Sequence, residues 1–138
     1  MNKILLVLLC LGLTGCATIT LSQAVVPNRE NLLKLSIGMS KEEALKVMGT
    51  MPFSAGTGLF AIRGSDEKTV PSTTINNPYR SEILQGKDKI FEVLYYVTDD
   101  KTGNNIITDD GLTPLVFDNG KLIGWGRSFL QDNAQNMK

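Results

Sequence analysis

Two pairs of neighbouring aspartates are the side chains whose type and spacing come nearest to a chemical site. Asp99-Asp100 and Asp109-Asp110 flank a polar connection that also holds Asn104 and Asn105. Carboxylate and amide oxygens bind Ca²⁺, and paired carboxylates carry out glycoside hydrolysis. The spacing is not that of an EF-hand, however, and no aromatic sugar-binding platform accompanies the pairs. The pattern therefore favours a solvated connection between strands, with a cation site or a hydrolase site as alternatives.

No other catalytic constellation is present in the sequence. The chain has no His, so it lacks the usual general base near neutral pH and the commonest metal ligand. Hydrolytic triads of the usual kind are therefore excluded, and no P-loop, G-x-G-x-x-G or C-x-x-C pattern occurs. Lys plus Arg number 14, as do Asp plus Glu, whereas a nucleic-acid-binding protein normally carries a basic excess. We expect no enzyme activity, no cofactor, no metal and no nucleic-acid partner.

The first sixteen residues resemble the export signal of a bacterial lipoprotein. A short basic start precedes an apolar run from Ile4 to Leu13, which is shorter than the roughly 20 residues that a membrane-spanning helix needs. The run ends in Leu13-Thr14-Gly15-Cys16, which is similar to a lipobox. The resemblance implies cleavage after residue 15 and a diacylglyceryl thioether on an acylated Cys16. The alternative is an ordinary signal peptide followed by an unmodified cysteine.

Lipidation would leave the exported chain without a free thiol. Cys10 lies in the apolar run and leaves with it, and Cys16 would be capped. The domain would then be stabilised by its core rather than by the disulfides that exported proteins often form. Ala17 follows the cysteine, where Asp would resemble an inner-membrane retention signal. The resemblance therefore implies an acyl anchor in the outer membrane of a Gram-negative bacterium, with the domain facing the periplasm.

The length of 138 residues suits a single domain. We expect four segments along the chain: a cleaved signal peptide over residues 1–15, a lipidated N-terminus and tether over 16–27, a single α+β domain over 28–131 and a frayed tail over 132–138.

Two helices are predicted at the start of the domain. Asn28 can cap a short helix over 28–35. The segment 41–48 is the stronger helix, because Ser40 and Glu43 form a capping box and a glycine follows the last residue. Between this helix and the strands, residues 50–78 are rich in Gly, Ser and Thr. They indicate an irregular excursion with a short strand over 59–62.

Antiparallel strands are predicted in the second half. Residues 90–98 are rich in β-branched and aromatic side chains, with a fully apolar face and a mixed one. Segments 113–118 and 121–128 form a hairpin, since Asn119-Gly120 is the preferred dipeptide of a type I′ turn. Continuing this register pairs three sets of residues, Asp118 with Lys121, Phe117 with Leu122, and Val116 with Ile123. It also places Gly124 and Gly126 on the face of Leu115, as a trough for a helix, and Trp125 on the opposite face.

The expected fold is α+β, with two N-terminal helices packed on a three-stranded antiparallel sheet and a four-stranded sheet as the alternative. Aromatic and Arg side chains at the end of the long excursion and of the last strand suggest an interaction surface, because such residues dominate binding hot spots. These residues are Tyr79, Arg80, Trp125, Arg127 and Phe129.

Two segments resemble the SmpA/OmlA (BamE-like) small outer-membrane lipoproteins. The first runs from Leu35 to Glu43 and continues in Met48-Gly49 and Pro52, and the second runs from Leu115 to Leu122. The resemblance implies two helices on a three-stranded antiparallel sheet, as in BamE and BLIP-like folds. It also implies a non-enzymatic accessory role in outer-membrane assembly or envelope integrity. We therefore expect a lipid-anchored domain that binds another envelope protein, with a carrier of small ligands or lipids in the glycine trough as the alternative.

Overall fold

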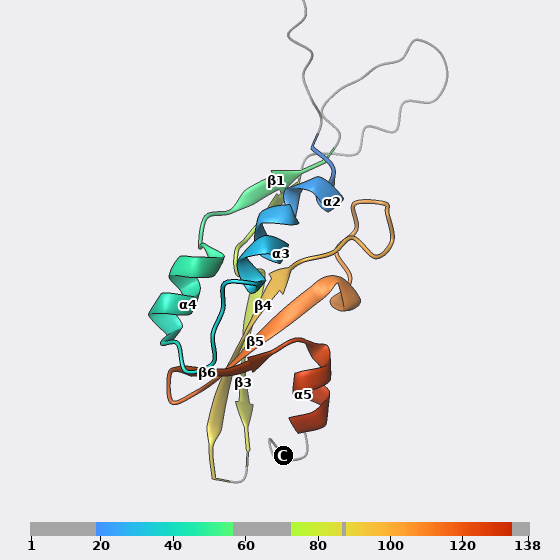
Figure 1. The fold of residues 1–138 in the computed structure, drawn as a ribbon. Coiled ribbons are helices and arrows are strands. Elements are labelled where there is room, and N and C mark those ends of the chain that lie inside the picture. The colour runs from blue at the N-terminus through green and yellow to red at the C-terminus, as the bar shows by residue number, and fades with distance from the viewer. Residues whose placement is uncertain (1–18, 57–72, 87, 134–138) are drawn as a thin grey trace, which may run out of the picture.

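The strand predicted over residues 90–98 forms the centre of the fold. In the computed structural model, which describes residues 19–56, 73–86 and 88–133, this strand is β4, Ile90–Val97 (Figure 1). It pairs with β3, Arg80–Gln85, and with β5, Leu112–Asp118, and β6, Lys121–Trp125, lies beyond β5. All pairs in this four-stranded sheet are antiparallel. The α+β class is confirmed, and the sheet has the fourth strand that the sequence left as an alternative.

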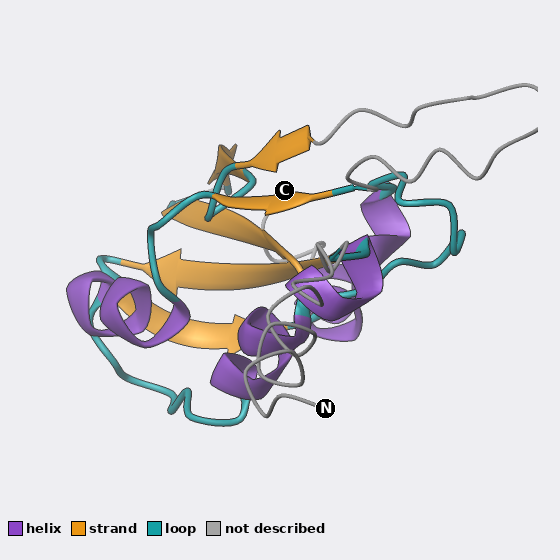
Figure 2. Ribbon diagram, turned by 90° about the horizontal axis from the view of Figure 1, so that it is seen from above, coloured by secondary structure: helices purple, strands orange, loops and turns teal. Residues whose placement is uncertain are grey.

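Beyond its first residues, both faces of β4 are buried, because other elements cover each side of the sheet (Figure 2). The side chains of Phe91, Val93, Tyr95 and Val97 belong to one apolar cluster. The alternate face was expected to be mixed, and it carries the exposed Ile90 and the half-buried Glu92 beside Leu94 and Tyr96, which are only 3% and 0% exposed. Leu94 and Tyr96 pack with Ala44 and Met48 in a second cluster.

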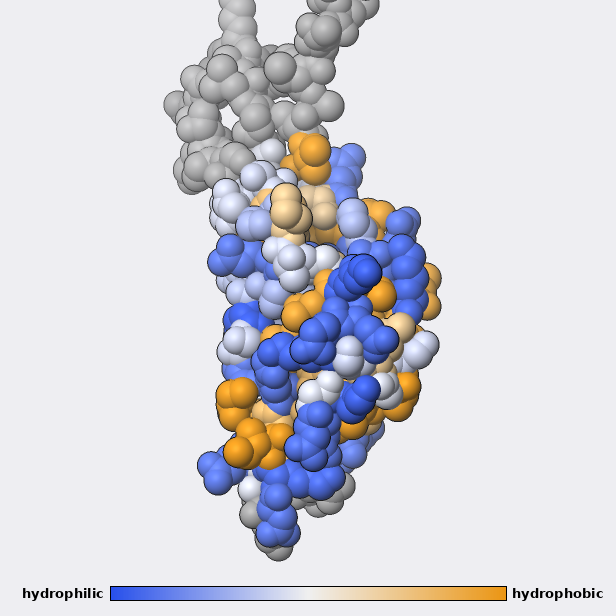
Figure 3. All heavy atoms as spheres, turned by 90° about the vertical axis from the view of Figure 1, so that its left-hand side faces the viewer, coloured by the Kyte–Doolittle hydropathy of each residue, from blue (hydrophilic) through white to orange (hydrophobic). Residues whose placement is uncertain are grey.

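The predicted helix over 41–48 is confirmed as α4, Lys41–Met48. The backbone N–H of Glu43 donates to Ser40 Oγ (3.2 Å), and the Ser40 N–H donates to Glu43 Oε2 (2.7 Å), which completes the capping box. Gly49 ends the helix with a φ of 83°, a conformation that favours glycine. The outer side of α4 is hydrophilic, whereas hydrophobic side chains gather below it at the lower part of the sheet (Figure 3).

The tether expected over residues 16–27 is wrong from Leu21 onward. Residues 21–24 form α2, Leu21–Ala24, and the helix expected over 28–35 begins earlier and ends earlier, as α3, Val26–Leu32. Leu21 and Val25 are fully buried in the core. The helical spacing of the buried positions 21, 25 and 28 was hidden because the third of them is the polar Asn28 and because Pro27 precedes it. Residues 16–18, including Cys16, lie outside the described residues, as does the expected signal peptide.

The hairpin turn and the pairs Asp118–Lys121 and Phe117–Leu122 are confirmed, but the register beyond them is not. Asn119 and Gly120 have φ values of 49° and 72°, and Asp118 pairs with Lys121. A β-bulge between Val116 and Phe117 then shifts the pairing, so that Val116 lies opposite Gly124 rather than Ile123. The bulge inserts one extra residue into β6 and moves the later side chains to the other face. Trp125 therefore packs with the cluster that contains Leu115, Phe117 and Leu122.

The segments that precede and follow the four-stranded sheet in the sequence form further elements that were not expected. Residues from the long excursion form β1, Phe53–Ala55, and β2, Thr73–Ile75, which pair as a separate two-stranded sheet. The strand expected over 59–62 lies outside the described residues. The last strand ends at Trp125 rather than 128, and α5, Arg127–Asn133, replaces its end and the start of the expected frayed tail. Gly126, with a φ of 93°, makes the change from strand to helix.

In the part of the chain that the structure describes, no helix is long and apolar enough to cross a membrane.

Candidate functional site

A hollow of 170 Å³ lies between the start of β3, the start of β5 and α5. We call it the β3–α5 hollow. Its apolar lining comes from Tyr95, Leu112, Pro114 and Leu130, and its polar lining comes from Arg80, Asp109, Arg127 and Gln131. Leu112 and Pro114 are buried because they belong to the central strands, so the hollow has a rigid floor. The hollow thus has an apolar base with charged groups at its edge.

Arg80 is held firmly on one side of this hollow. Its guanidinium carbon lies 4.4 Å from the centroid of the Tyr95 ring, which is a cation–π contact. Nη1 lies 3.0 Å from Asp109 Oδ1, and Nε lies 3.2 Å from Glu82 Oε1. Nε is buried and has no hydrogen bond despite that proximity. Burial opposes the charge, but the Asp109 and Glu82 carboxylates outweigh it and raise the pKa of Arg80, so this side chain stays charged.

The hydroxyl of Tyr95, whose ring lies beneath Arg80, also keeps its proton. Burial, together with the Glu82 carboxylate that accepts its hydrogen bond, raises the pKa of Tyr95. The hydroxyl of Tyr95 donates to Glu82 Oε2 at 3.0 Å. The base of the hollow therefore contains an uncharged aromatic ring under a fixed cation, a surface suited to binding rather than to proton transfer.

Arg127 faces the hollow from α5 and differs from Arg80 in its partners. Within the described residues it makes no ion pair. It also lines an adjoining hollow of 280 Å³, in which Arg29 and Lys101 both pair with Asp99 and the Asp110 carboxylate lies near Arg127. An exposed guanidinium at the edge of an apolar pocket can pair with a carboxylate of a bound partner.

The structure brings together only part of the expected interaction surface. Arg80 and Arg127 line the same hollow, and Tyr79 is next to Arg80 with 39% of its surface exposed. Trp125 instead packs on the opposite face of the sheet. Phe129 is half-buried and covers Gly124: a methyl group added at that glycine would lie 2.5 Å from ring atoms of Phe129. The trough expected on the face of Leu115 is therefore wrong: the bulge turns Gly124 to the face of Val116, and Phe129 fills the place beside it.

Several residues of the hollow were missed from the sequence. Tyr95 was assigned only to a buried strand face, and Pro114 and Leu130 were not singled out. Their proximity to Arg80 depends on the pairing of Arg80 with Tyr95 across β3 and β4. Recognising residues 80–85 as a strand would have revealed this proximity, because the pairing of that strand with the next one places Tyr95 opposite Arg80.

The aspartate-rich connection is organised by its own hydrogen bonds and ion pairs. Asp100 Oδ1 accepts from the N–H of Gly103 at 2.9 Å, and Asp100 Oδ2 accepts from the N–H of Asn105 at 3.2 Å. Hydrogen bonding from Lys101 lowers the pKa of Asp99, and the Thr108 hydroxyl lowers that of Asp110. No group of three His, Cys, Asp or Glu suited to a metal ion occurs among the described residues. These carboxylates therefore fit the role of ordering the connection between β4 and β5 better than that of a cation site or a general acid.

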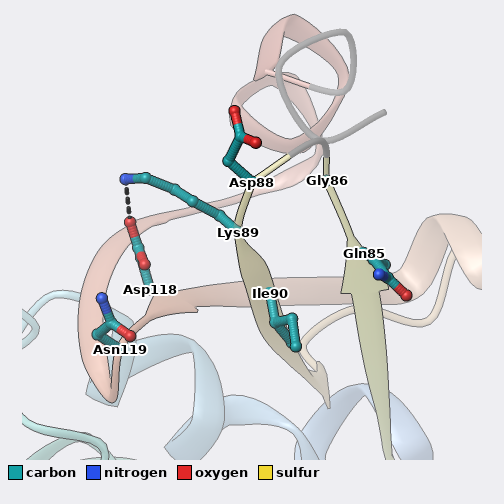
Figure 4. A pocket seen from close by; sticks show the side chains of 7 residues that line it. All are labelled: Gln85, Gly86, Asp88, Lys89, Ile90, Asp118 and Asn119. Carbon is teal, nitrogen blue, oxygen red and sulfur yellow. Dashed lines mark hydrogen bonds and ion pairs between the residues drawn. The ribbon is translucent and has the colours of Figure 1, made fainter.

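A wider hollow of 450 Å³ lies between the β3–β4 turn and the β5–β6 turn (Figure 4). Lys89 reaches across it, and its Nζ lies 2.6 Å from Asp118 Oδ2. Gln85, Asp88 and Ile90 point in different directions rather than toward a common point. Because its polar groups do not converge, this hollow is the weaker candidate for a ligand site.

Comparison with known proteins places the chain in a family. The model of a family described as "Protein of unknown function (DUF3192)" matches residues 21–132. The chain belongs to this DUF3192 family. The match begins at the first residue of α2 and includes every residue that lines the β3–α5 hollow. No curated protein and no solved structure matches the chain. The resemblance of this DUF3192 domain to SmpA/OmlA lipoproteins stays a prediction.

Proposed function

We propose that this chain is a non-enzymatic lipoprotein, anchored through Cys16 in the outer membrane, whose periplasmic domain binds another envelope protein. The observation that carries the proposal is the β3–α5 hollow, where an apolar base lies between a fixed cation, Arg80, and an exposed cation, Arg127. The partner chemistry that suits it is an apolar or aromatic side chain next to a carboxylate. The apolar group would cover Tyr95 and Leu112, and the carboxylate would pair with Arg127.

The size of the hollow favours a protein partner over a small ligand. Small-molecule sites usually enclose about 300–1,000 Å³, because they must bury most of the ligand surface. The β3–α5 hollow has 170 Å³, which suits a single inserted side chain. The alternative, a carrier of small ligands or lipids, needed the trough beside Gly124, and Phe129 occupies that place.

The anchor is supported by the sequence before the domain. The Leu13-Thr14-Gly15-Cys16 motif follows an apolar run of signal-peptide length. An acyl chain contributes about 0.8 kcal/mol per buried CH₂, so a single chain gives only weak, reversible membrane binding. Two or more acyl chains on such a cysteine hold a protein firmly. An anchored domain meets its partner within the envelope, where even a small interface acts at high local concentration.

Affinity capture from solubilised outer membranes tests the proposal. Arg127→Ala removes the exposed cation of the hollow, and Lys46→Ala removes another exposed cation from α4, on the other side of the sheet. Wild type and the Lys46 variant should recover the same envelope protein, and the Arg127 variant should recover much less of it. Recovery that is equal in all three proteins, or no reproducible partner for wild type, would refute binding at this hollow. A Cys16→Ser variant that still sediments with membranes would refute the anchor separately.

A further inference from the structure

The chain between the proposed lipid anchor and the folded domain is very short. Only Ala17 and Thr18 separate Cys16 from Ile19, the first residue that the structure describes. Three residue steps span at most about 11 Å, since an extended chain advances about 3.3–3.6 Å per residue. Ile19 is fixed to the domain, because its carbonyl accepts the N–H of Gly56 at 3.0 Å. If Cys16 is lipidated as proposed above, this end of the domain cannot leave the bilayer surface.

Exposed apolar side chains occur at the same end of the domain. Ile19 is 52% exposed, and Ile106, in the connection between β4 and β5, is 55% exposed. The segments that carry them are linked, since the N–H of Leu21 donates to Asn105 Oδ1 at 2.7 Å. The first residue of α3, Val26, is also exposed there, at 39%. Single exposed isoleucines are ordinary, but these lie within reach of a short anchor.

The two hairpin turns of the main sheet point the other way. α2 and β1 lie at the upper end of the molecule, and the β3–β4 and β5–β6 turns lie toward the lower end (Figure 1). Ile90, at the start of β4 beside the β3–β4 turn, is 62% exposed and thus resembles Ile106 in type and exposure. The two isoleucines differ in their position along the molecule, which makes them a matched pair.

We propose that the end of the domain carrying Ile19 and Ile106 rests on the membrane, with these side chains in the interfacial layer of the lipid. The sheet then stands away from the bilayer, and its hairpin turns point into the periplasm. Apolar side chains of interfacial elements enter the boundary between headgroups and acyl chains by about 5–10 Å. The partner of this surface is therefore a lipid bilayer, and the inference rests on the proposed lipidation of Cys16.

A depth measurement on the lipidated protein tests this orientation. The mature lipoprotein has no free thiol of its own, so Ile106→Cys and Ile90→Cys each introduce a single site for a fluorophore. Each labelled lipoprotein is reconstituted into vesicles of phosphatidylethanolamine and phosphatidylglycerol that contain lipids with a nitroxide near the headgroup. Quenching by a nitroxide falls steeply with distance, so a label in the interfacial layer should be quenched several-fold more strongly than one far from it.

The expected result is strong quenching at position 106 and weak quenching at position 90, with both proteins floating with the vesicles. Adding Ile19→Asp to the Ile106→Cys protein should lower its quenching toward the value at position 90. Equal quenching at the two positions in protein that floats with the vesicles would overturn the orientation while leaving the anchor intact. Protein that does not float would overturn the anchor itself, and with it this inference.

Discussion

Replacing Gly124 by alanine should disturb the packing of Phe129, a residue of α5, on the sheet. The added methyl group would lie 2.5 Å from Cδ2 and Cζ of Phe129, far closer than carbon atoms can approach. The ring must therefore leave the surface of β6, or the backbone of α5 must shift. Overpacking of this kind costs about 1–3 kcal/mol in the free energy of unfolding.

An upper limit on this cost comes from Phe129 itself, since the ring can always leave its place. Truncating a buried Phe costs about 3–5 kcal/mol, and Phe129 is only half-buried, so Phe129→Ala should cost about 2 kcal/mol. Gly124→Ala should cost a similar amount. In the Phe129→Ala background, however, the methyl group has room, and Gly124→Ala becomes neutral or gains about 0.5 kcal/mol from reduced freedom of the unfolded chain. The coupling between the two positions is thus about 2 kcal/mol.

Urea unfolding of the single and double variants measures this coupling. Trp125 is the chain's one tryptophan and adjoins Gly124, so its fluorescence reports on the site. The chain would be prepared from residue 16 with Cys16→Ser. Ser128→Ala, at an exposed position of α5, serves as the control and should change stability by less than about 0.5 kcal/mol. Additive costs for Gly124→Ala and Phe129→Ala would refute the packing of Phe129 over the glycine.

Three further predictions concern stability. Asn28 is buried, and its Nδ2 donates to Val97 O at 2.9 Å. Asn28→Ala should cost about 2 kcal/mol in the free energy of unfolding by urea, because it leaves that carbonyl without its partner. Asn31→Ala on the same helix should cost much less, and equal costs would contradict this role of Asn28. Gly120 has a φ of 72°, so Gly120→Ala should lower the free energy of unfolding by about 1 kcal/mol. Asn119→Gly should leave the free energy of unfolding nearly unchanged. A Gly120→Ala variant as stable as wild type would argue against the type I′ turn. Burial raises the pKa of Tyr96 from 10.0 to about 12, so the fold favours the neutral phenol. This contribution is complete below pH 10.0 and is lost as the pH rises toward 12. Urea midpoints should therefore fall less over this range in Tyr96→Phe than in wild type, and parallel curves for the two proteins would count against the shift.

The local elements could be predicted where a few neighbouring residues determine them. The capping box of Ser40 and Glu43 fixes the start of α4 whatever surrounds it, and Asn119-Gly120 fixes the turn because few other dipeptides accept two positive φ values. The β-bulge was not predictable in the same way. The bulge places Gly124 under Phe129, a residue of a helix that the sequence indicated as strand and tail.

The candidate site was predictable in its residue types but not in its assembly. Arg80 and Arg127 were expected at an interaction surface, and both line the β3–α5 hollow. Trp125 belongs to the other face because the bulge reverses its direction, and Tyr95 enters the hollow because β3 pairs with β4. Both effects arise from pairing between strands, which is non-local and leaves little trace in a single segment of sequence.

Photo-crosslinking from the hollow in intact envelopes tests the central claim most directly. A photoreactive amino acid replaces Gln131, at the edge of the β3–α5 hollow, or Glu42, an exposed residue of α4. The account predicts a defined adduct with one envelope protein from position 131, none from position 42, and loss of the adduct when Arg127→Ala is added. Absence of an adduct from position 131, or the same adduct from both positions, would contradict it.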